Sequence, residues 1–176
     1  MSIDLAALTK TLKERFGDEV LGHSAFRGQT VVRIKHTANV KILTFLRDDP
    51  SAAFDMLTDI TCLDSLRLPD DMQKEYPERF AVVYQLTSLA HNDRLRVKAF
   101  VPEDPCEIET VSELWAAANW GEREAFDMFG VIFRGHPDLK RILMPDNYEG
   151  HPLRKDYPLK GRGERDNFPK YTELAN

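Results

Sequence analysis

Residues 80–101 read FAVVYQLTSLAHNDRLRVKAFV and contain two segments that predict neighbouring β-strands, residues 80–86 and 94–101. The second segment alternates apolar and mostly basic residues, which is the period of a strand with one buried face. The stretch His91-Asn92-Asp93 between them predicts a hairpin turn. The side of the second strand expected to face solvent carries Arg94, Arg96, Lys98 and Phe100.

Shorter segments on the N-terminal side of this hairpin predict further strands. Residues 20–21 and 30–34 predict a second hairpin, and residues 54–66 predict a strand. Residues 69–78 contain proline and paired acids, which predict a polar loop. Alternate residues of the 54–66 strand are expected to lie on one face, and these are Met56, Thr58, Ile60, Cys62 and Asp64.

Helical patterns frame these strands. Apolar spacing predicts helices over residues 3–16, with Ser2 as the N-cap, and over residues 37–47. Thr110 and Glu113 have capping-box spacing and predict the start of a helix that includes both tryptophans, Trp115 and Trp120. Two arrangements are open for the tryptophans. Either both face the core, or one of them faces a neighbouring protein instead.

The pattern remains helical over residues 122–129, where Gly130 is expected to end the helix in a left-handed conformation. Residues 131–133 then predict a short strand. The fold class expected for residues 1–133 is α+β, a small mixed or antiparallel sheet with helices packed on it.

Residues 134–176 are expected to form an extended, irregular C-terminal arm. They contain five prolines and four glycines, a composition poorly suited to a second core. Disorder is the alternative, but apolar residues are spread along the segment as separate anchors, which favours docking on a partner. The anchors are Leu139, Ile142, Leu143, Met144, Leu153, Tyr157, Leu159, Phe168 and Tyr171.

Charge and cysteine content exclude several classes of protein. The formal net charge is −5 and no basic face is indicated, which argues against nucleic acid binding. Cys62 and Cys106 have no metal-ligand or cluster-ligand spacing and suit a reducing compartment. The N-terminal residues do not resemble a secretory signal, and no apolar run has the length of about 20 residues that a membrane helix needs.

The tripeptide Gly-His-Pro occurs twice, at residues 135–137 and 150–152. A metal site formed by His136 and His151 with nearby acids is one interpretation, and it would make the chain a free-standing metal hydrolase. The spacing matches no established ligand pattern, and each motif is sufficiently explained as a rigid turn.

Acidic residues also cluster in the helix predicted over residues 122–129. Glu122, Glu124 and Asp127 could form an acid–base site, but pairing with Arg123 or Arg134 is the expected role. No arrangement for nucleophilic catalysis and no phosphate-binding loop is present, so no catalytic centre or cofactor is expected.

The residues from Glu122 onward resemble a known family, the thirty-kilodalton subunit of respiratory complex I. The resemblance rests on the motifs Glu122-Arg123-Glu124, Asp127-Met128-Phe129-Gly130, Gly135-His136-Pro137-Asp138-Leu139, Arg141-Ile142-Leu143 and Gly150-His151-Pro152-Leu153-Arg154-Lys155-Asp156-Tyr157-Pro158. It implies a cofactor-free subunit of the peripheral arm of proton-translocating NADH:quinone oxidoreductase, on the cytoplasmic side of the inner membrane.

The resemblance also implies partners. The arm is expected to lie across the hydrogenase-large-subunit-like quinone-site subunit and to contact adjacent iron-sulfur subunits, and the chain meets the membrane only through the complex. An equivalent subunit of a membrane-bound hydrogenase or another dehydrogenase complex is the nearest alternative. The residues expected at the partner interface are Glu122, Arg123, Glu124, Asp127, His136, Asp138, Arg141, His151, Arg154, Lys155, Asp156 and Tyr157.

Overall fold

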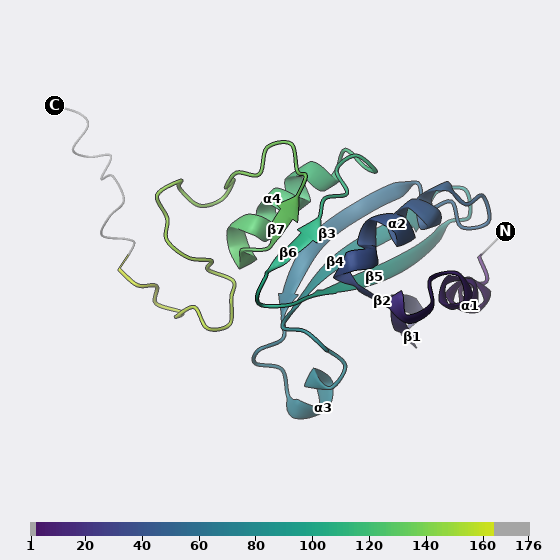
Figure 1. Ribbon diagram of the computed structural model, residues 1–176, viewed down its shortest axis with the longest axis horizontal. Coiled ribbons are helices and arrows are strands. Elements are labelled where there is room, and N and C mark those ends of the chain that lie inside the picture. The colour runs from purple at the N-terminus through teal and green to yellow at the C-terminus, as the bar shows by residue number, and fades with distance from the viewer. Residues whose placement is uncertain (1–2, 164–176) are drawn as a thin grey trace.

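The computed structural model describes residues 3–163. Five strands form a mixed sheet in the order β1-β2-β5-β4-β3, and two more form a small parallel sheet (Figure 1). In the larger sheet β2 and β5 run parallel, and the other neighbours run antiparallel. The α+β class is therefore confirmed. The elements are α1 (Leu5–Phe16), β1 (Val20–Phe26), β2 (Gln29–Lys35), α2 (Asn39–Asp48), β3 (Met56–Asp64), α3 (Asp70–Gln73), β4 (Phe80–Ser88), β5 (Asp93–Val101), β6 (Glu107–Glu109), α4 (Ala118–Phe129) and β7 (Ile132–Arg134).

The predicted central hairpin is β4 and β5, which pair over their full length. One row of each strand lies on the face of the sheet that the helices cover. In β5 the alternation in sequence becomes burial in space, whereas residues 80–84 of β4 are buried on both faces. At the middle of the sheet this row includes Val32, Val97, Tyr84 and Ile60, one from each of four adjacent strands. All four side chains are buried.

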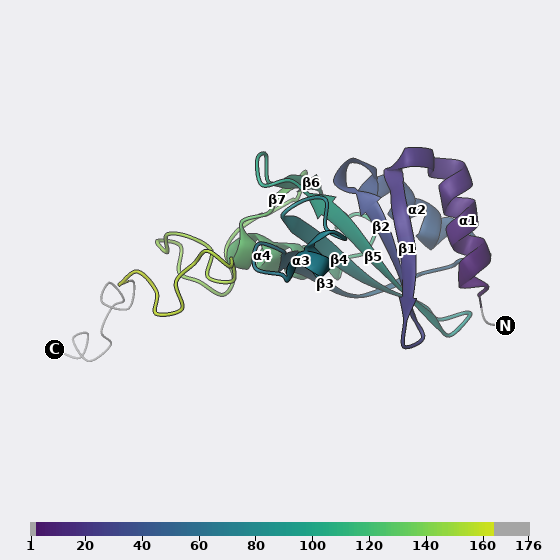
Figure 2. The same ribbon diagram turned by 90° about the horizontal axis from the view of Figure 1, so that it is seen from below.

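Helices α1, α2 and α4 pack on this face, with α1 and α2 over the β1–β2 side and α4 over β3 (Figures 1 and 2). Buried Asn39 at the start of α2 donates from Nδ2 to the Glu109 carbonyl at 2.7 Å and to the Tyr84 hydroxyl at 3.4 Å. Burial raises the pKa of Tyr84, so the phenol stays neutral inside the core.

The opposite face of the sheet is partly covered by the connection between β3 and β4. Tyr76 packs edge-on against Phe100, with 5.5 Å between ring centroids, and accepts a hydrogen bond from Lys98 at 2.6 Å. Phe100 is consequently buried, whereas the alternation pattern placed it on a solvent-facing row. The connection predicted as a loop also contains the one-turn helix α3.

Helix α4 begins later than predicted. The capping-box spacing of Thr110 and Glu113 does not start a helix: residues 112–117 form turns, and α4 begins at Ala118. The Thr110 hydroxyl accepts from the Ser112 amide at 3.1 Å and also bonds to Glu122, so it holds a turn against α4 without a helix following it directly. Trp115 is buried and donates to the Asp55 carbonyl at 3.1 Å, while Trp120 is 63% exposed.

Two other expectations need correction. A bulge between Leu57 and Asp59 shifts the register of β3, so Leu57 is buried while Met56 and Thr58 are exposed. The predicted core face holds from Ile60 onward. In α1 the N-cap is Asp4, whose carboxylate accepts from the amides of Ala6 and Ala7, while Ser2 lies outside the described residues.

Within residues 3–163, no helix combines the length and apolar character needed to cross a membrane.

Close packing of α4 on β3 depends on Gly121. A Cβ atom at this position would lie 3.0 Å from the Ile60 Cβ and 3.4 Å from the Ile60 carbonyl oxygen. We predict that Gly121→Val lowers the free energy of unfolding by about 1–3 kcal/mol, because the strand backbone cannot yield and the helix must shift. Urea unfolding followed by circular dichroism measures this.

The matched control is Ala116→Val, at an exposed position before α4. It should leave the urea midpoint nearly unchanged. A Gly121→Val variant as stable as the parent chain would show that the α4–β3 contact tolerates separation.

Candidate docking site

The arm, described here over residues 134–163, contains no helix or strand after Arg134 in that range. It leaves β7, passes the C-terminal half of α4, and turns back toward the end of β3 (Figure 1). Because it lacks regular backbone pairing, its N–H groups must find other acceptors. Two buried carboxylates of the folded domain, one on α4 and one at the end of β3, accept from four of these N–H groups.

The first carboxylate is Asp127, which is fully buried. Its Oδ2 accepts hydrogen bonds from the amides of Ile142, Leu143 and Met144 at 3.0, 2.7 and 2.9 Å. Its Oδ1 accepts from the Arg141 guanidinium at 2.6 Å. Four charge-assisted contacts therefore fix residues 141–144 against α4.

Burial by itself would raise the pKa of Asp127. The three amides and Arg141 more than offset that effect, and the pKa lies below its ordinary value. Arg141 also donates to the Gly150 carbonyl at 3.0 Å, so the same cation connects two turns of the arm. The expectation that Asp127 forms a structural ion pair is confirmed, but with Arg141 instead of Arg123 or Arg134.

The end of α4 forms the next contact. Gly130 ends the helix with φ 75°, as predicted, and a Cβ there would lie 2.5 Å from the His151 ring and 2.8 Å from Arg154. His151 donates through Nδ1 to the Asp127 carbonyl at 3.0 Å, and Arg154 donates through Nε to the Phe129 carbonyl at 2.6 Å. These two side chains satisfy carbonyl groups that a helix end leaves unpaired. Burial lowers the pKa of His151.

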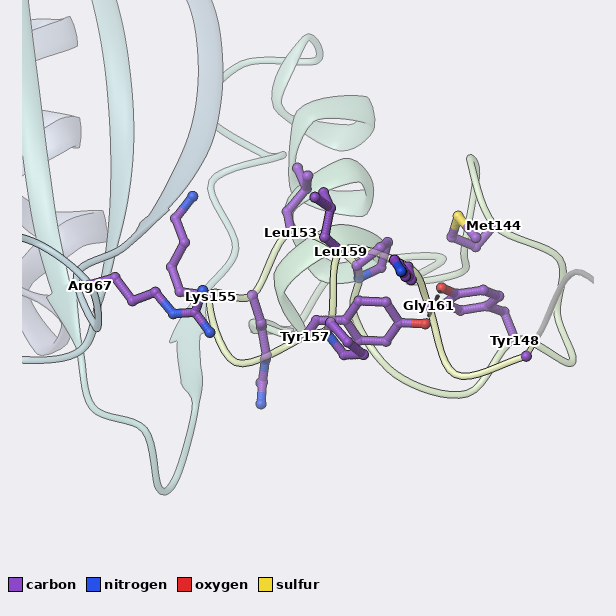
Figure 3. A pocket seen from close by; sticks show the side chains of 13 residues that line it. Arg67, Met144, Tyr148, Leu153, Lys155, Tyr157, Leu159 and Gly161 are labelled. Carbon is purple, nitrogen blue, oxygen red and sulfur yellow. Dashed lines mark hydrogen bonds between the residues drawn. The ribbon is translucent and has the colours of Figure 1, made fainter.

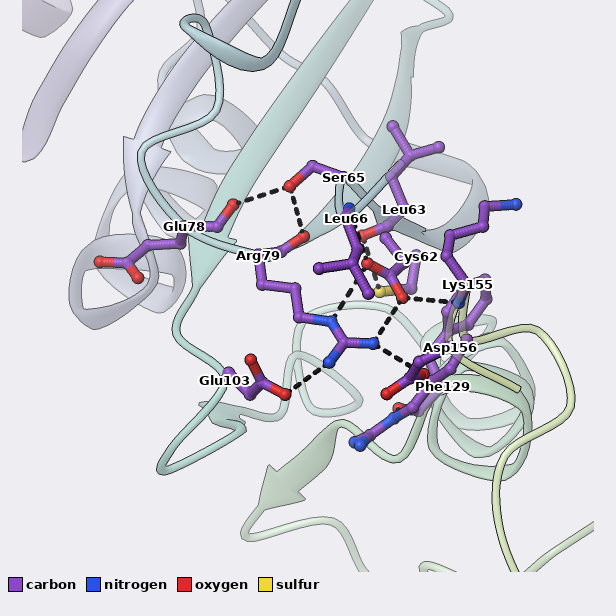
Figure 4. Close-up of polar contacts among 12 residues, drawn as sticks. Cys62, Leu63, Ser65, Leu66, Glu78, Arg79, Glu103, Phe129, Lys155 and Asp156 are labelled. Carbon is purple, nitrogen blue, oxygen red and sulfur yellow. Dashed lines mark hydrogen bonds and ion pairs between the residues drawn. The ribbon is translucent and has the colours of Figure 1, made fainter. Parts of the chain in front are cut away.

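The second carboxylate is Asp64, at the end of β3, whose side chain is fully buried. It accepts from the Lys155 amide at 2.8 Å and from both Nε and Nη2 of Arg79, at 3.2 and 2.9 Å. Arg79 also contacts Glu103 and Asp156, the latter at 2.8 Å (Figure 4). One guanidinium thus joins the sheet, the segment after β5 and the arm.

The pKa values follow this geometry. Burial opposes ionisation of Asp64, but the bonds from Arg79 and from the Lys155 and Leu66 amides leave its pKa below the ordinary value. The hydrogen bond to Asp64 raises the pKa of Arg79, and Arg79 in turn lowers the pKa of Asp156. All these groups remain charged at neutral pH.

Glu122 is a third buried carboxylate, but it holds the segment before α4 instead of the arm. It accepts from the Val111 amide at 2.7 Å and from the Thr110 hydroxyl. No ion pair with Glu122 occurs among the described residues, so the expected structural ion pairing is wrong for this residue. Burial raises its pKa to about 7, against the opposing effect of its two donors.

The first Gly-His-Pro turn is held by backbone contacts. His136 donates through Nε2 to the Asn119 carbonyl at 3.1 Å and accepts through Nδ1 from the Asp138 amide at 3.0 Å. Both ring nitrogens are therefore used, and the tautomer is fixed. Residues 3–163 contain no group of three or more His, Cys, Asp or Glu side chains able to hold a metal ion. The rigid-turn interpretation accounts for this histidine.

The remaining predicted interface residues lie at or near the surface. Arg123 donates to the Lys140 carbonyl at 3.2 Å, and its guanidinium lies 4.8 Å from the ring centre of Trp120. Glu124 and the Lys155 side chain are exposed, and Tyr157 shares a hydroxyl–hydroxyl bond of 2.7 Å with Tyr148. The predicted set therefore divides into internal residues that seat the arm and outward residues that a partner could touch.

Asp64 and Arg79 were not predicted as members of this site, whereas Trp120 is the exposed one of the two tryptophans, of which one was considered for a neighbouring protein. The sequence signal at Asp64 was an acid at the end of a strand face whose other members are uncharged. Arg79 gave no signal, because it follows a loop and its partners lie 15, 24 and 77 positions away.

The chain matches the family model described as "Respiratory-chain NADH dehydrogenase, 30 Kd subunit" over residues 32–163. This chain belongs to that family. The matched range includes the sheet from within β2 onward, α4 and the described arm. This match confirms the family that the motifs from Glu122 onward indicated.

Curated relatives share most of the chain. A protein of Geobacter metallireducens, named as the C subunit of NADH-quinone oxidoreductase, is 51% identical over 152 residues, which cover 86% of this chain and 88% of the relative. The Geobacter sulfurreducens protein of the same name is 48% identical over 150 residues, covering 85% and 87%. Family membership thus identifies the chain as the C-type subunit of an oxidoreductase complex.

Two solved structures are similar in fold. The trypsin-resistant fragment of Nqo5 aligns with a TM-score of 0.64 and 35% identity, covering 75% of this chain and 98% of the fragment. A chain of the membrane-bound sulfane sulfur reductase, an archaeal respiratory membrane complex, aligns with a TM-score of 0.68 and 20% identity, covering 94% and 92%. At that identity the second match shows a shared fold alone.

We predict that Asp127→Asn loosens the arm. The asparagine side chain is uncharged, so it cannot form an ion pair with Arg141, and its contacts with the three backbone amides lose their charge assistance. The free energy of unfolding should therefore fall by about 3 kcal/mol. Hydrogen exchange should become faster at the amides of residues 142–144. The amides of β4 and β5 should still exchange more slowly than these. Mass spectrometry after proteolysis measures both regions.

The control Asp138→Asn removes an exposed carboxylate of the same arm, whose partner is the exposed Lys140. It should leave exchange at residues 142–144 unchanged. Equal exchange in the Asp127 variant and this control would contradict the seating role of Asp127.

We predict that Glu122→Gln changes the pH dependence of stability. The folded pKa of about 7 lies above the ordinary value of 4.5, so burial of Glu122 costs little below pH 4.5 and destabilises the fold as pH rises through 7. The glutamine variant escapes this loss. Relative to the parent chain it should gain up to about 3 kcal/mol between about pH 5 and pH 8.

Urea midpoints across this pH range provide the measurement, and Glu124→Gln, exposed on the same helix, is the control. A stability difference between the parent chain and Glu122→Gln that stays constant with pH would contradict the assignment.

Proposed function

We propose that this chain is a structural, non-redox subunit of the peripheral arm of NADH-quinone oxidoreductase. In this role it clamps the quinone-site subunit, which is hydrogenase-large-subunit-like, to adjacent iron-sulfur subunits on the cytoplasmic side of the membrane. Transfer of electrons from NADH to quinone needs centres held at fixed separations. A clamp that touches several subunits restricts their relative motion without taking part in the chemistry.

The observation that carries the proposal is that the arm is attached to the domain through internal contacts while some of its side chains point outward. Four of its backbone amides, those of residues 142–144 and of Lys155, bond to Asp127 and Asp64 inside the chain, so these contacts do not use the outward side chains of the arm. Leu143 and Leu153 are left 58% and 48% exposed. A segment that is ordered in advance loses less entropy on binding, which favours its use as an interface.

A second feature is the exposed side of α4 next to the arm. Trp120 is 63% exposed, and Arg123 lies over its ring. Tryptophan and arginine are the residue types most often dominant at interfaces. This chain is 51% identical to a C subunit of NADH-quinone oxidoreductase and only 20% identical to the aligned chain of the sulfane sulfur reductase. The difference favours NADH-quinone oxidoreductase over a related membrane complex.

We predict that Trp120→Ala lowers the share of the chain that co-migrates with NADH-quinone reductase activity. Native membranes are solubilised gently, complexes are separated by size, and the chain is quantified in each fraction. Loss of an interface tryptophan should weaken association by about 2 kcal/mol or more. Folding of the variant should be unaffected, because the side chain is exposed.

The matched control is Phe26→Ala, an equally exposed aromatic residue at 70%, on the β1–β2 hairpin. It should co-migrate like the parent chain. A parent chain found alone in the soluble fraction would overturn the proposed function, and equal behaviour of the two variants would remove Trp120 from the interface.

A further inference from the structure

A hollow of about 920 Å³ lies between the far part of the arm and the connection that follows β3 (Figure 3). Arg67 and Lys155 lie toward one end of it, and Tyr148 and Met144 lie toward the other. The remaining wall is formed mostly by residues 152–161 of the arm. Several lining residues also seat the arm, but they do so through their backbone amides or, for Arg154, through Nε.

The charge of this hollow is one-sided. Arg67, Arg154, Lys155 and Lys160 line it, and within residues 3–163 its lining includes no aspartate or glutamate. Among the described residues none of these four cations forms an ion pair. The nearby Arg79, by contrast, contacts three carboxylates. In this part of the chain the internal cation is fully paired, whereas the four cations of the hollow form no direct ion pair, and Arg154 acts only at longer range on Asp156, whose pKa is lowered mainly by Arg79 and further by Arg154.

Apolar and aromatic groups accompany these cations. Leu159 is fully exposed, and Leu153 is half exposed. Tyr148 and Tyr157 stand together through their hydroxyl bond. Cations among exposed apolar and tyrosine side chains are the composition of a protein interface. A small free anion would make no favourable contact with the exposed leucine side chains.

The walls of the hollow are fixed by backbone contacts. The Lys155 amide is held by Asp64, and the Leu153 amide donates to the Met128 carbonyl at 3.1 Å. The Tyr157 amide donates to the Arg154 carbonyl at 3.1 Å. A preformed surface of this kind can bind a partner with little further loss of conformational entropy.

We propose that this hollow binds an acidic segment of a partner subunit, a stretch with two or more Asp or Glu side chains next to an apolar anchor. The carboxylates meet Arg67, Lys155 and Lys160, and the anchor packs on Leu153 and Leu159. The inference rests on the proposed function and deepens it, because it specifies the chemistry of the partner surface.

The first test reverses the charge of the three exposed cations, Arg67→Glu with Lys155→Glu and Lys160→Glu. Arg154 is retained because it holds the end of α4. The share of the chain that co-migrates with the oxidoreductase should fall by about tenfold or more, since like charges would then face each other. The urea midpoint of the isolated variant should match that of the parent chain.

The control reverses three exposed cations elsewhere, Lys10, Lys35 and Arg94, and keeps the same net charge change. It should co-migrate normally. If the parent chain co-migrates and both triple variants do so equally, the inference fails while the proposed function stands. If the parent chain itself does not co-migrate, the proposed function fails.

A zero-length carbodiimide cross-link identifies the occupant directly in the purified complex. The reagent joins a lysine amine to a carboxylate with loss of water, so Lys155 or Lys160 should become linked to an Asp or Glu of another subunit. Links confined to this chain or to a second copy of it would overturn the inference. So would reduced binding of the triple variant to anionic phosphatidylglycerol vesicles without any cross-link between subunits.

Discussion

The carboxylate of Asp127 is the interaction on which the course of the arm depends. It lies near the C-terminal end of α4, where the helix dipole disfavours a negative charge, and it is shielded from water. Such a charge is tolerated only with strong compensation. Three consecutive amides and a guanidinium of the arm supply it, so the folded domain needs the arm as much as the arm needs the domain.

This dependence explains how a proline- and glycine-rich segment becomes ordered without a core. Its turns satisfy their backbone groups on acceptors that the α+β domain presents at fixed positions. Gly130 allows the approach, because any side chain at this position would collide with His151 and Arg154. Glycine, histidine and arginine at these positions therefore form one steric and electrostatic unit, although at least twenty residues separate the glycine from the other two.

Alternating residues in β5 made the centre of the sheet predictable, because a strand with one buried face has a period that the sequence displays. Events that depend on distant partners were not predictable. The bulge between Leu57 and Asp59 changes which residues of β3 face the core, and the Thr110 hydroxyl bonds to the distant Glu122. The candidate site follows the same division. The signature marked Asp127, His151 and Arg141, but no local pattern could show that their partners lie within the chain.

The three carboxylates around Arg79 have a consequence for the order in which the arm separates from the domain. If Asp156 moves away, Arg79 keeps Asp64 and Glu103, so no buried charge loses its partner. If residues 142–144 move away, Asp127 loses three donors in a site shielded from solvent. Opening therefore begins at the far end of the arm and stops at Asp127. The arm is therefore attached to the domain at two points of unequal strength, a weaker one at Asp156 and a stronger one at Asp127.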